Sequence, residues 1–133
     1  MKIVLDTNVQ LAALIARGVC HQLLEHCVSR HILFTSDFIL DETQEKLIEK
    51  FGYSSELAAE AVSVLRSRMT VVSASKLENP VCRDPDDDNI LAAAISGECD
   101  CIISGDKDLL VLKQYQGINI FSPRDFLMNE EVG

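Results

Sequence analysis

Two hydrophobic patterns alternate along this chain, and their alternation restricts the possible folds more than any other feature of the sequence. Five short apolar runs have the length and composition of buried strands: residues 2–5, 32–35, 70–73, 101–104 and 118–121. Segments with helical spacing of apolar residues lie between them. Strands that alternate with helices are typical of an open parallel sheet. We therefore predict an α/β protein, a three-layer α/β/α sandwich with a five-stranded parallel sheet.

The expected helices are bounded by residues that favour helix ends. We predict helical structure over residues 9–16, 19–28, 37–51, 55–69 and 85–96, with Gly52 and Gly97 ending two of these segments. Shorter helical turns are expected after Gly105 and Pro123. We expect residues 129–133 to form a frayed tail.

Length and composition indicate one folded domain. The chain has 133 residues and is 47% hydrophobic, so residues 1–133 suffice for one core but not for two domains. No apolar run approaches the roughly 20 residues of a membrane span. The start of the chain has no signal-peptide pattern, and the five cysteines have no disulfide spacing. We therefore expect a cytoplasmic protein with reduced thiols and no membrane partner.

The net charge of −9 argues against nucleic-acid binding through bulk positive charge. It leaves open a nucleic-acid enzyme that recruits metal cations. Four acids fall where such a site would form. Asp6 ends the first strand, and Glu42 lies in the helix after the second. Asp88 lies in the first turns of the helix at 85–96, and Asp106 follows the fourth strand. Because ligands of open parallel sheets bind beyond the carboxyl ends of the strands, we expect these side chains to converge.

Each acid also has a purely structural interpretation. Asp6 is placed to cap a helix, and Glu42 precedes Lys46 by four residues, the spacing of a surface ion pair. Asp106 could belong to a polar turn. Asp84, Asp86 and Asp87 suit the start of a helix, whereas Asp88 exceeds what a cap needs.

Taken together, the four acids favour a metal site. Four carboxylates within about 5 Å would form six repelling pairs, each costing roughly 3 kcal/mol at an effective dielectric of about 20. Either some of these groups stay protonated or cations occupy the site. Divalent cations relieve the repulsion directly, and an all-oxygen ligand set suits Mg²⁺ or Mn²⁺. Such a site activates water for attack on phosphorus. The histidines, His21, His26 and His31, lie elsewhere in the sequence, and we interpret them as surface or packing residues.

Several sequence segments resemble PIN-domain ribonucleases. They are Ile3-Val4-Leu5-Asp6-Thr7-Asn8, the helix with Glu42 after Thr35-Ser36, residues 83–92, Ile103-Ser104-Gly105-Asp106-Lys107-Asp108, and residues 120–127. The resemblance covers nearly the whole chain and is greatest to bacterial VapC-like ribonucleases, the toxins of toxin–antitoxin pairs.

This resemblance implies the strand order 3-2-1-4-5 and cleavage of RNA with Mg²⁺ or Mn²⁺. It implies that Asp6, Glu42, Asp88 and Asp106 are catalytic and metal-binding. Asn8, Ser104 and Asp108 would support them. The Asp-x-Ile-Leu-Ala pattern favours Asp88 over Asp87, although both remain candidates.

The resemblance also suggests an antitoxin partner and a homodimer. Cations flanking the motifs are candidates for contact with RNA: Arg17, Lys46, Lys50, Arg83 and Lys107. Two other functions stay open. One is a PIN fold that binds or regulates with weak or no catalysis, and the other is a receiver-like phosphoacceptor domain.

Overall fold

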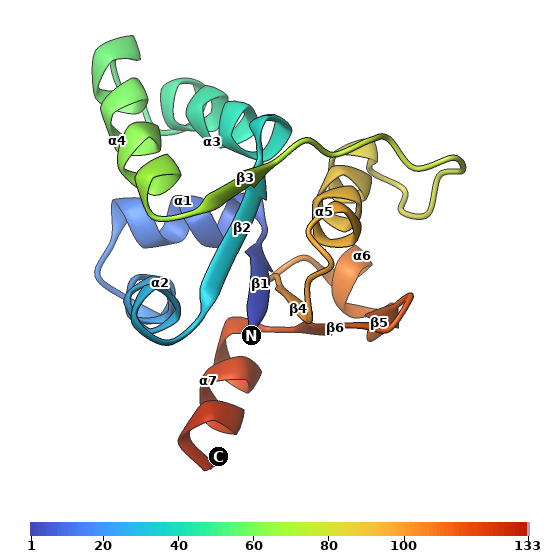
Figure 1. The fold of residues 1–133 in the computed structure, drawn as a ribbon. Coiled ribbons are helices and arrows are strands. Elements are labelled where there is room, and N and C mark those ends of the chain that lie inside the picture. Colours follow the sequence, from blue (N-terminus) through green and yellow to red (C-terminus); the bar gives the residue numbers. More distant parts are fainter. Residues whose placement is uncertain (133) are drawn as a thin grey trace.

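The sheet of this protein has six strands in the order β3-β2-β1-β4-β6-β5 (Figure 1). The structure is a computed structural model that describes residues 1–132, with side chains described for residues 1–130. Five strands are parallel: β1 (Lys2–Leu5), β2 (Ile32–Ser36), β3 (Thr70–Val72), β4 (Cys101–Ile103) and β6 (Ile118–Phe121). Since β6 is the fifth of the predicted strands, the predicted parallel order 3-2-1-4-5 is confirmed.

The sixth strand, β5 (Gln114–Tyr115), was not predicted. It pairs antiparallel with β6 at the edge of the sheet. The residues between the two strands, Gln116 and Gly117, both have positive φ angles, 49° and 81°. Positive φ at both positions is the requirement of a type I′ hairpin turn, for which Asn-Gly is the usual sequence signal. The turn has glutamine where asparagine is usual, and β5 is only two residues long, so the sequence contains no recognisable hairpin pattern here.

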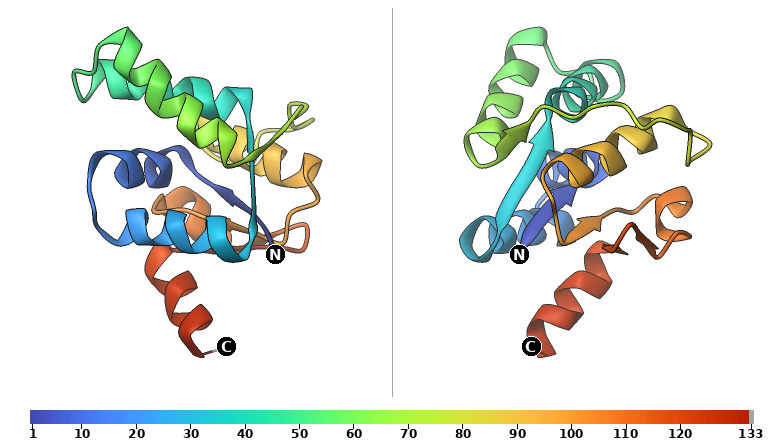
Figure 2. Two further views of the ribbon diagram at one scale, coloured as in Figure 1. Left: turned by 60° about the vertical axis from the view of Figure 1, so that its left-hand side comes forward. Right: turned by 45° about the vertical axis from the view of Figure 1, so that its right-hand side comes forward.

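Helices cover both faces of the sheet (Figure 2). One face carries α1 (Thr7–Ile15), α2 (Val19–Arg30), α3 (Asp37–Glu49) and α4 (Ser55–Ser67), and the other carries α5 (Pro85–Ser96) and α6 (Lys107–Leu110). The last helix, α7 (Pro123–Val132), packs against α2. Within residues 1–132, no helix has the length and apolar character needed to cross a membrane.

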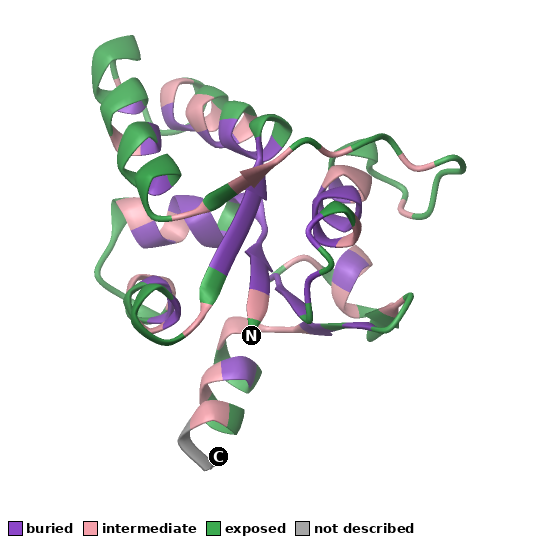
Figure 3. Ribbon diagram, viewed as in Figure 1, coloured by how far each residue is buried: buried purple, intermediate pink, exposed green. Residues whose placement is uncertain are grey.

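The central strand β1 shows why the strands are almost wholly apolar. Ile3 and Leu5 point into the core beneath α1 to α4, and Val4 points into the core beneath α5. All three side chains are fully buried (Figure 3). Successive side chains of a strand face opposite sides, so a strand covered on both sides needs an apolar residue at every position.

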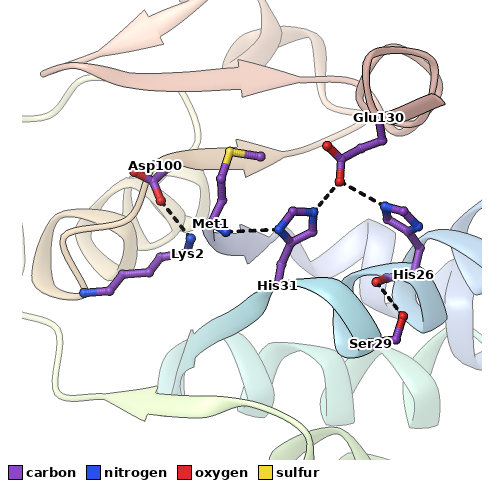
Figure 4. Close-up of polar contacts among 7 residues, drawn as sticks. All are labelled: Met1, Lys2, His26, Ser29, His31, Asp100 and Glu130. Carbon is purple, nitrogen blue, oxygen red and sulfur yellow. Dashed lines mark hydrogen bonds and ion pairs between the residues drawn. The ribbon is translucent and has the colours of Figure 1, made fainter. Parts of the chain in front are cut away.

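The C-terminal segment differs from the frayed tail that we predicted. Helix α7 continues to Val132, and Gly133 lies outside the described residues. The Glu130 carboxylate accepts hydrogen bonds from Nε2 of His26, at 2.9 Å, and from Nε2 of His31 (Figure 4). Both rings also pack edge-on against Phe126. These long-range contacts hold the helix against the domain, and they give two of the histidines the packing role that we expected.

We expect the Glu130→Gln variant to lower the free energy of unfolding by about 1 kcal/mol, because the amide is a weaker acceptor for the two imidazole groups. Urea denaturation at pH 7 measures this. The matched control is Glu60→Gln, which changes an exposed acid on α4. Equal losses in the two variants would contradict a specific role for Glu130.

Candidate active site

Asp6 lies directly after β1 and caps α1. Its Oδ1 accepts a hydrogen bond from the Val9 backbone N–H at 2.8 Å, the usual N-cap contact. Its Oδ2 accepts a hydrogen bond from the Ser104 hydroxyl. The residue is 3% exposed, and this burial raises the pKa of the Asp6 carboxyl while the two hydrogen bonds oppose the rise. The cap interpretation of Asp6 is therefore correct, but the cap is also a buried carboxylate.

Ser104 connects Asp6 to Asp106. The serine follows β4, is fully buried, and accepts a hydrogen bond from the Asp106 backbone N–H at 2.9 Å while its hydroxyl donates to Asp6. Asp106 in turn caps α6, with its Oδ1 accepting from the Asp108 N–H at 2.8 Å. The Asp6 carboxylate and the Asp106 backbone, which follow the adjacent strands β1 and β4, are thereby held by bonds to the same hydroxyl group.

Asp87, in the first turn of α5, points toward these two acids. It is 8% exposed, and its buried Oδ2 accepts no hydrogen bond from the described residues. Carboxylate oxygens of Asp87, Asp106 and Asp108 lie within 4.8 Å of one another. Burial, followed by the charges of Asp106, Asp84, Asp6 and Asp108, raises the pKa of Asp87 to about 7.

Asp88 is the predicted site residue that the structure places elsewhere. Its carboxylate accepts hydrogen bonds from the backbone N–H groups of Cys82, at 2.8 Å, and Val81, at 3.1 Å. It thus fastens the segment before α5 to the first turn of that helix. Consecutive helical residues point about 100° apart, so Asp87 and Asp88 cannot both face the acids of β1 and β4.

Glu42 approaches from α3, which follows β2. Burial raises the pKa of the Glu42 carboxyl, and Asp86 raises it further, whereas Thr7 and the charge of Lys46 lower it. The position four residues before Lys46 was also compatible with a surface ion pair, but no salt bridge joins the two among the described residues. Glu42 is instead half-buried beside the acids of α5.

These side chains surround a hollow of about 80 Å³, which we call the acidic hollow. It is lined by Asp6, Thr7, Asn8, Glu42, Lys46, Asp84, Asp86, Asp87, Ile90 and Asp106. Six of these residues are acids and one is a cation, so their charges are far from balanced. The structure therefore brings Asp6, Glu42 and Asp106 together as expected, adds Asp87, and leaves Asp88 out.

The acidic hollow fits a divalent cation that prefers oxygen ligands. Its acids offer carboxylate oxygens only, which is the donor set of Mg²⁺ and Mn²⁺ and not that of Zn²⁺. Among the described residues, the buried Oδ2 of Asp87 has no hydrogen-bond partner, and buried polar atoms normally have one. The space also suffices for an ion with water.

The residues predicted to support the site have different surroundings. Asn8 lines the acidic hollow, and Ser104 makes the bonds already described. Asp108 accepts a hydrogen bond from Arg83 at 2.9 Å, so it holds a cation close to the acids. Of the candidate cations, Lys46 lines the acidic hollow, whereas Arg17 lines a different hollow beside α2.

One sequence signal could have identified Asp87. Residues three and four positions after it are Ile90 and Leu91, both of which are buried in α5. The same test applied to Asp88 gives Leu91 and Ala92, so both acids border the apolar stripe. The larger pair of apolar neighbours favours Asp87 as the inward-facing residue.

Comparisons with known proteins identify the family and the fold of this chain. A family profile described as a PIN domain matches residues 2–108. A sequence comparison with curated proteins finds no match. Among solved structures, VapBC2 from Rickettsia felis, bound to a DNA fragment from its promoter, is similar with a TM-score of 0.64 and 15% identity, covering 90% of this chain and 97% of that chain.

Two further structures are similar. VapBC-1 from nontypeable Haemophilus influenzae has a TM-score of 0.65 and 17% identity, covering 93% of this chain and 99% of that one. VapC20 from Mycobacterium tuberculosis, a toxin that cleaves the sarcin–ricin loop, has a TM-score of 0.58 and 19% identity, covering 88% and 98%. At these identities the similarity establishes the fold.

The raised pKa of Asp87 predicts how stability depends on pH when metal is removed with EDTA. An acid whose pKa is raised by folding is deprotonated more easily in the unfolded chain, so its destabilising effect grows from about pH 4 to about pH 7. We expect Asp87→Asn to be more stable than the wild type at pH 8, with a smaller difference at pH 5. Urea denaturation at both pH values measures this, and a difference independent of pH would contradict it.

Proposed function

The chain belongs to the PIN-domain family, and we propose that it is an endoribonuclease that hydrolyses RNA phosphodiesters with Mg²⁺ or Mn²⁺. The observation that supports this most directly is the buried oxygen of Asp87 beside Asp6 and Asp106, which accepts no hydrogen bond from any residue that the structure describes. A bound cation would let three carboxylates crowded in this way stay ionised together, and a phosphodiester brought to that cation would lie at the mouth of the same hollow.

The side chains of the acidic hollow have separate tasks in this proposal. Asp6, Asp87 and Asp106 would hold the cation from three segments of the chain, and Glu42 would face them across the hollow. A divalent cation bound there supplies a water of lowered pKa and offsets negative charge on the phosphate. Ser104 keeps Asp6 and Asp106 in position before substrate binds, which limits reorganisation during the reaction. Lys46 offers a positive charge to the phosphate.

We further propose that the protein acts in the cytoplasm as the toxin of a toxin–antitoxin pair. The similarity to the VapBC structures, over nearly the full length of both chains, supports an antitoxin partner. An RNA substrate is supported by the similarity to VapC20, which cleaves an RNA loop. A homodimer is part of the same proposal, and light scattering tests it.

We expect Asp6→Asn to reduce RNA cleavage in Mn²⁺ by at least about 100-fold, because loss of the carboxylate weakens cation binding and disrupts the Ser104 contact. Cleavage of a labelled single-stranded RNA measures this, with EDTA abolishing wild-type activity and excess Mn²⁺ restoring it. Circular dichroism shows whether the variant folds. Equal cleavage by a folded Asp6→Asn variant would remove the enzymatic proposal and favour a binding module.

The neighbouring acids of α5 provide a matched pair of variants. We expect Asp87→Asn to lose cleavage by a similar factor to Asp6→Asn, since it faces the acidic hollow. Asp88→Asn should retain most of its cleavage but lose about 1–2 kcal/mol of stability, because its carboxylate holds two backbone N–H groups. Cleavage rates and urea denaturation distinguish the two effects. The reverse pattern would assign the cation to Asp88.

A further inference from the structure

Phe38 is a large apolar side chain that the fold leaves exposed close to the acidic hollow. It lies in the first turn of α3 and is 49% exposed. Glu42 follows four residues later, and residues at this spacing lie on the same face of a helix. The ring is therefore displayed on the face of α3 that carries a side chain of the acidic hollow.

Two further hollows meet at Phe38. One, of about 260 Å³, lies between α3 and α5 and shares Glu42 and Asp86 with the acidic hollow. The other, of about 550 Å³, extends from Phe38 and Asp86 to Lys76 in the segment before α5. The three hollows therefore lie next to one another, and acids outnumber the single lysine in the last of them.

The charges lining these hollows indicate which part of a nucleotide would occupy them. Asp41, Glu42, Glu45 and Asp86 line the hollow at Phe38, and they would repel a phosphate group. A nucleobase is neutral, so these carboxylates do not repel it. Its exocyclic amino groups can donate hydrogen bonds to them. Aromatic side chains bind unpaired bases by stacking, which tolerates any base.

We propose that Phe38 forms a nucleobase subsite in which an unpaired base adjacent to the cleaved phosphate stacks on the ring. The inference rests on the proposed ribonuclease function and names its substrate class, an unpaired stretch of RNA. The shared lining of the hollows lets the base reach Phe38 while the phosphate lies at the acidic hollow.

Phe51 provides a matched control. It is 44% exposed and follows the far end of α3, roughly 20 Å from Phe38 by the rise of the helix. Removing either ring deletes a similar exposed apolar surface from the same region of the sequence. Only Phe38 shares its hollow with Glu42.

The test is cleavage of a fluorescent single-stranded oligoribonucleotide in Mn²⁺ by the full chain. We expect Phe38→Ala to lower kcat/KM by about 5- to 150-fold, mainly through KM, since stacking contributes about that factor per base. Phe38→Trp should retain the wild-type value, and Phe51→Ala should be unchanged. An equal kcat/KM in Phe38→Ala and wild type would overturn the proposal.

An abasic nucleotide placed next to the cleaved bond makes the test specific. We expect this substrate to be cleaved less efficiently by the wild type, with Phe38→Ala showing no additional loss, because the variant and the abasic site remove the same contact. Independent losses in the two would show that Phe38 acts in another way and would overturn the subsite.

Failure of the proposed function gives a different result. If the wild type cleaves no RNA in Mn²⁺, the ribonuclease proposal fails, and binding of the same oligonucleotide is measured by fluorescence anisotropy. Weaker binding by Phe38→Ala, at the factor given above and without an effect of Phe51→Ala, would still support the subsite. Equal affinities would overturn it.

Discussion

Repulsion between carboxylates gathered from separate segments of the chain is the constraint on which this site depends. Asp6 and Asp106 follow the neighbouring strands β1 and β4, and Asp87 and Glu42 come from helices on opposite faces of the sheet. The backbone offsets part of the cost, because two of these acids also cap helices and accept N–H hydrogen bonds. The buried Oδ2 of Asp87 accepts no hydrogen bond within the part of the chain that the structure describes, so its share of the cost is not offset by hydrogen bonding, and a cation fits there.

Charged groups have different partners at the amino ends and at the carboxyl ends of the strands. At the edge where β1 begins, the Glu130 carboxylate meets two imidazole groups, and their hydrogen bonds lower the pKa of Glu130. At the carboxyl end of β1, six acids surround the acidic hollow with Lys46 as its one cation. Burial and the neighbouring acids raise the pKa of Asp87 to about 7. In the first cluster, the two imidazole groups supply the hydrogen bonds of the Glu130 carboxylate and hold α7 in place. In the second cluster, the chain balances only part of the negative charge, and a raised pKa of this kind is common at functional sites.

The proposed RNA chemistry must also accommodate a chain with a net charge of −9. Bulk attraction for phosphate is not available to it. The acidic hollow would recruit positive charge as a metal ion, and Phe38 would bind the uncharged part of the nucleotide beside it. Phosphate and base would thus be recognised by different surfaces, each suited to its charge.

The sequence by itself determined the elements that depend on local periodicity. Apolar spacing predicts the five parallel strands, the main helices and the position of Asp6 before a helix. The rule that ligands bind beyond the carboxyl ends of parallel strands predicts that Glu42 and Asp106 lie near Asp6. Tertiary structure decided the choice between Asp87 and Asp88, because both border the apolar stripe of α5, their apolar neighbours differ only in size, and packing sets the rotation of the helix. Tertiary structure also decided that the last segment forms a helix held against the protein, because α7 depends on contacts between Glu130 and histidines about a hundred residues earlier. Local sequence carries no record of contacts across such a separation, so these features emerge only when the chain has folded.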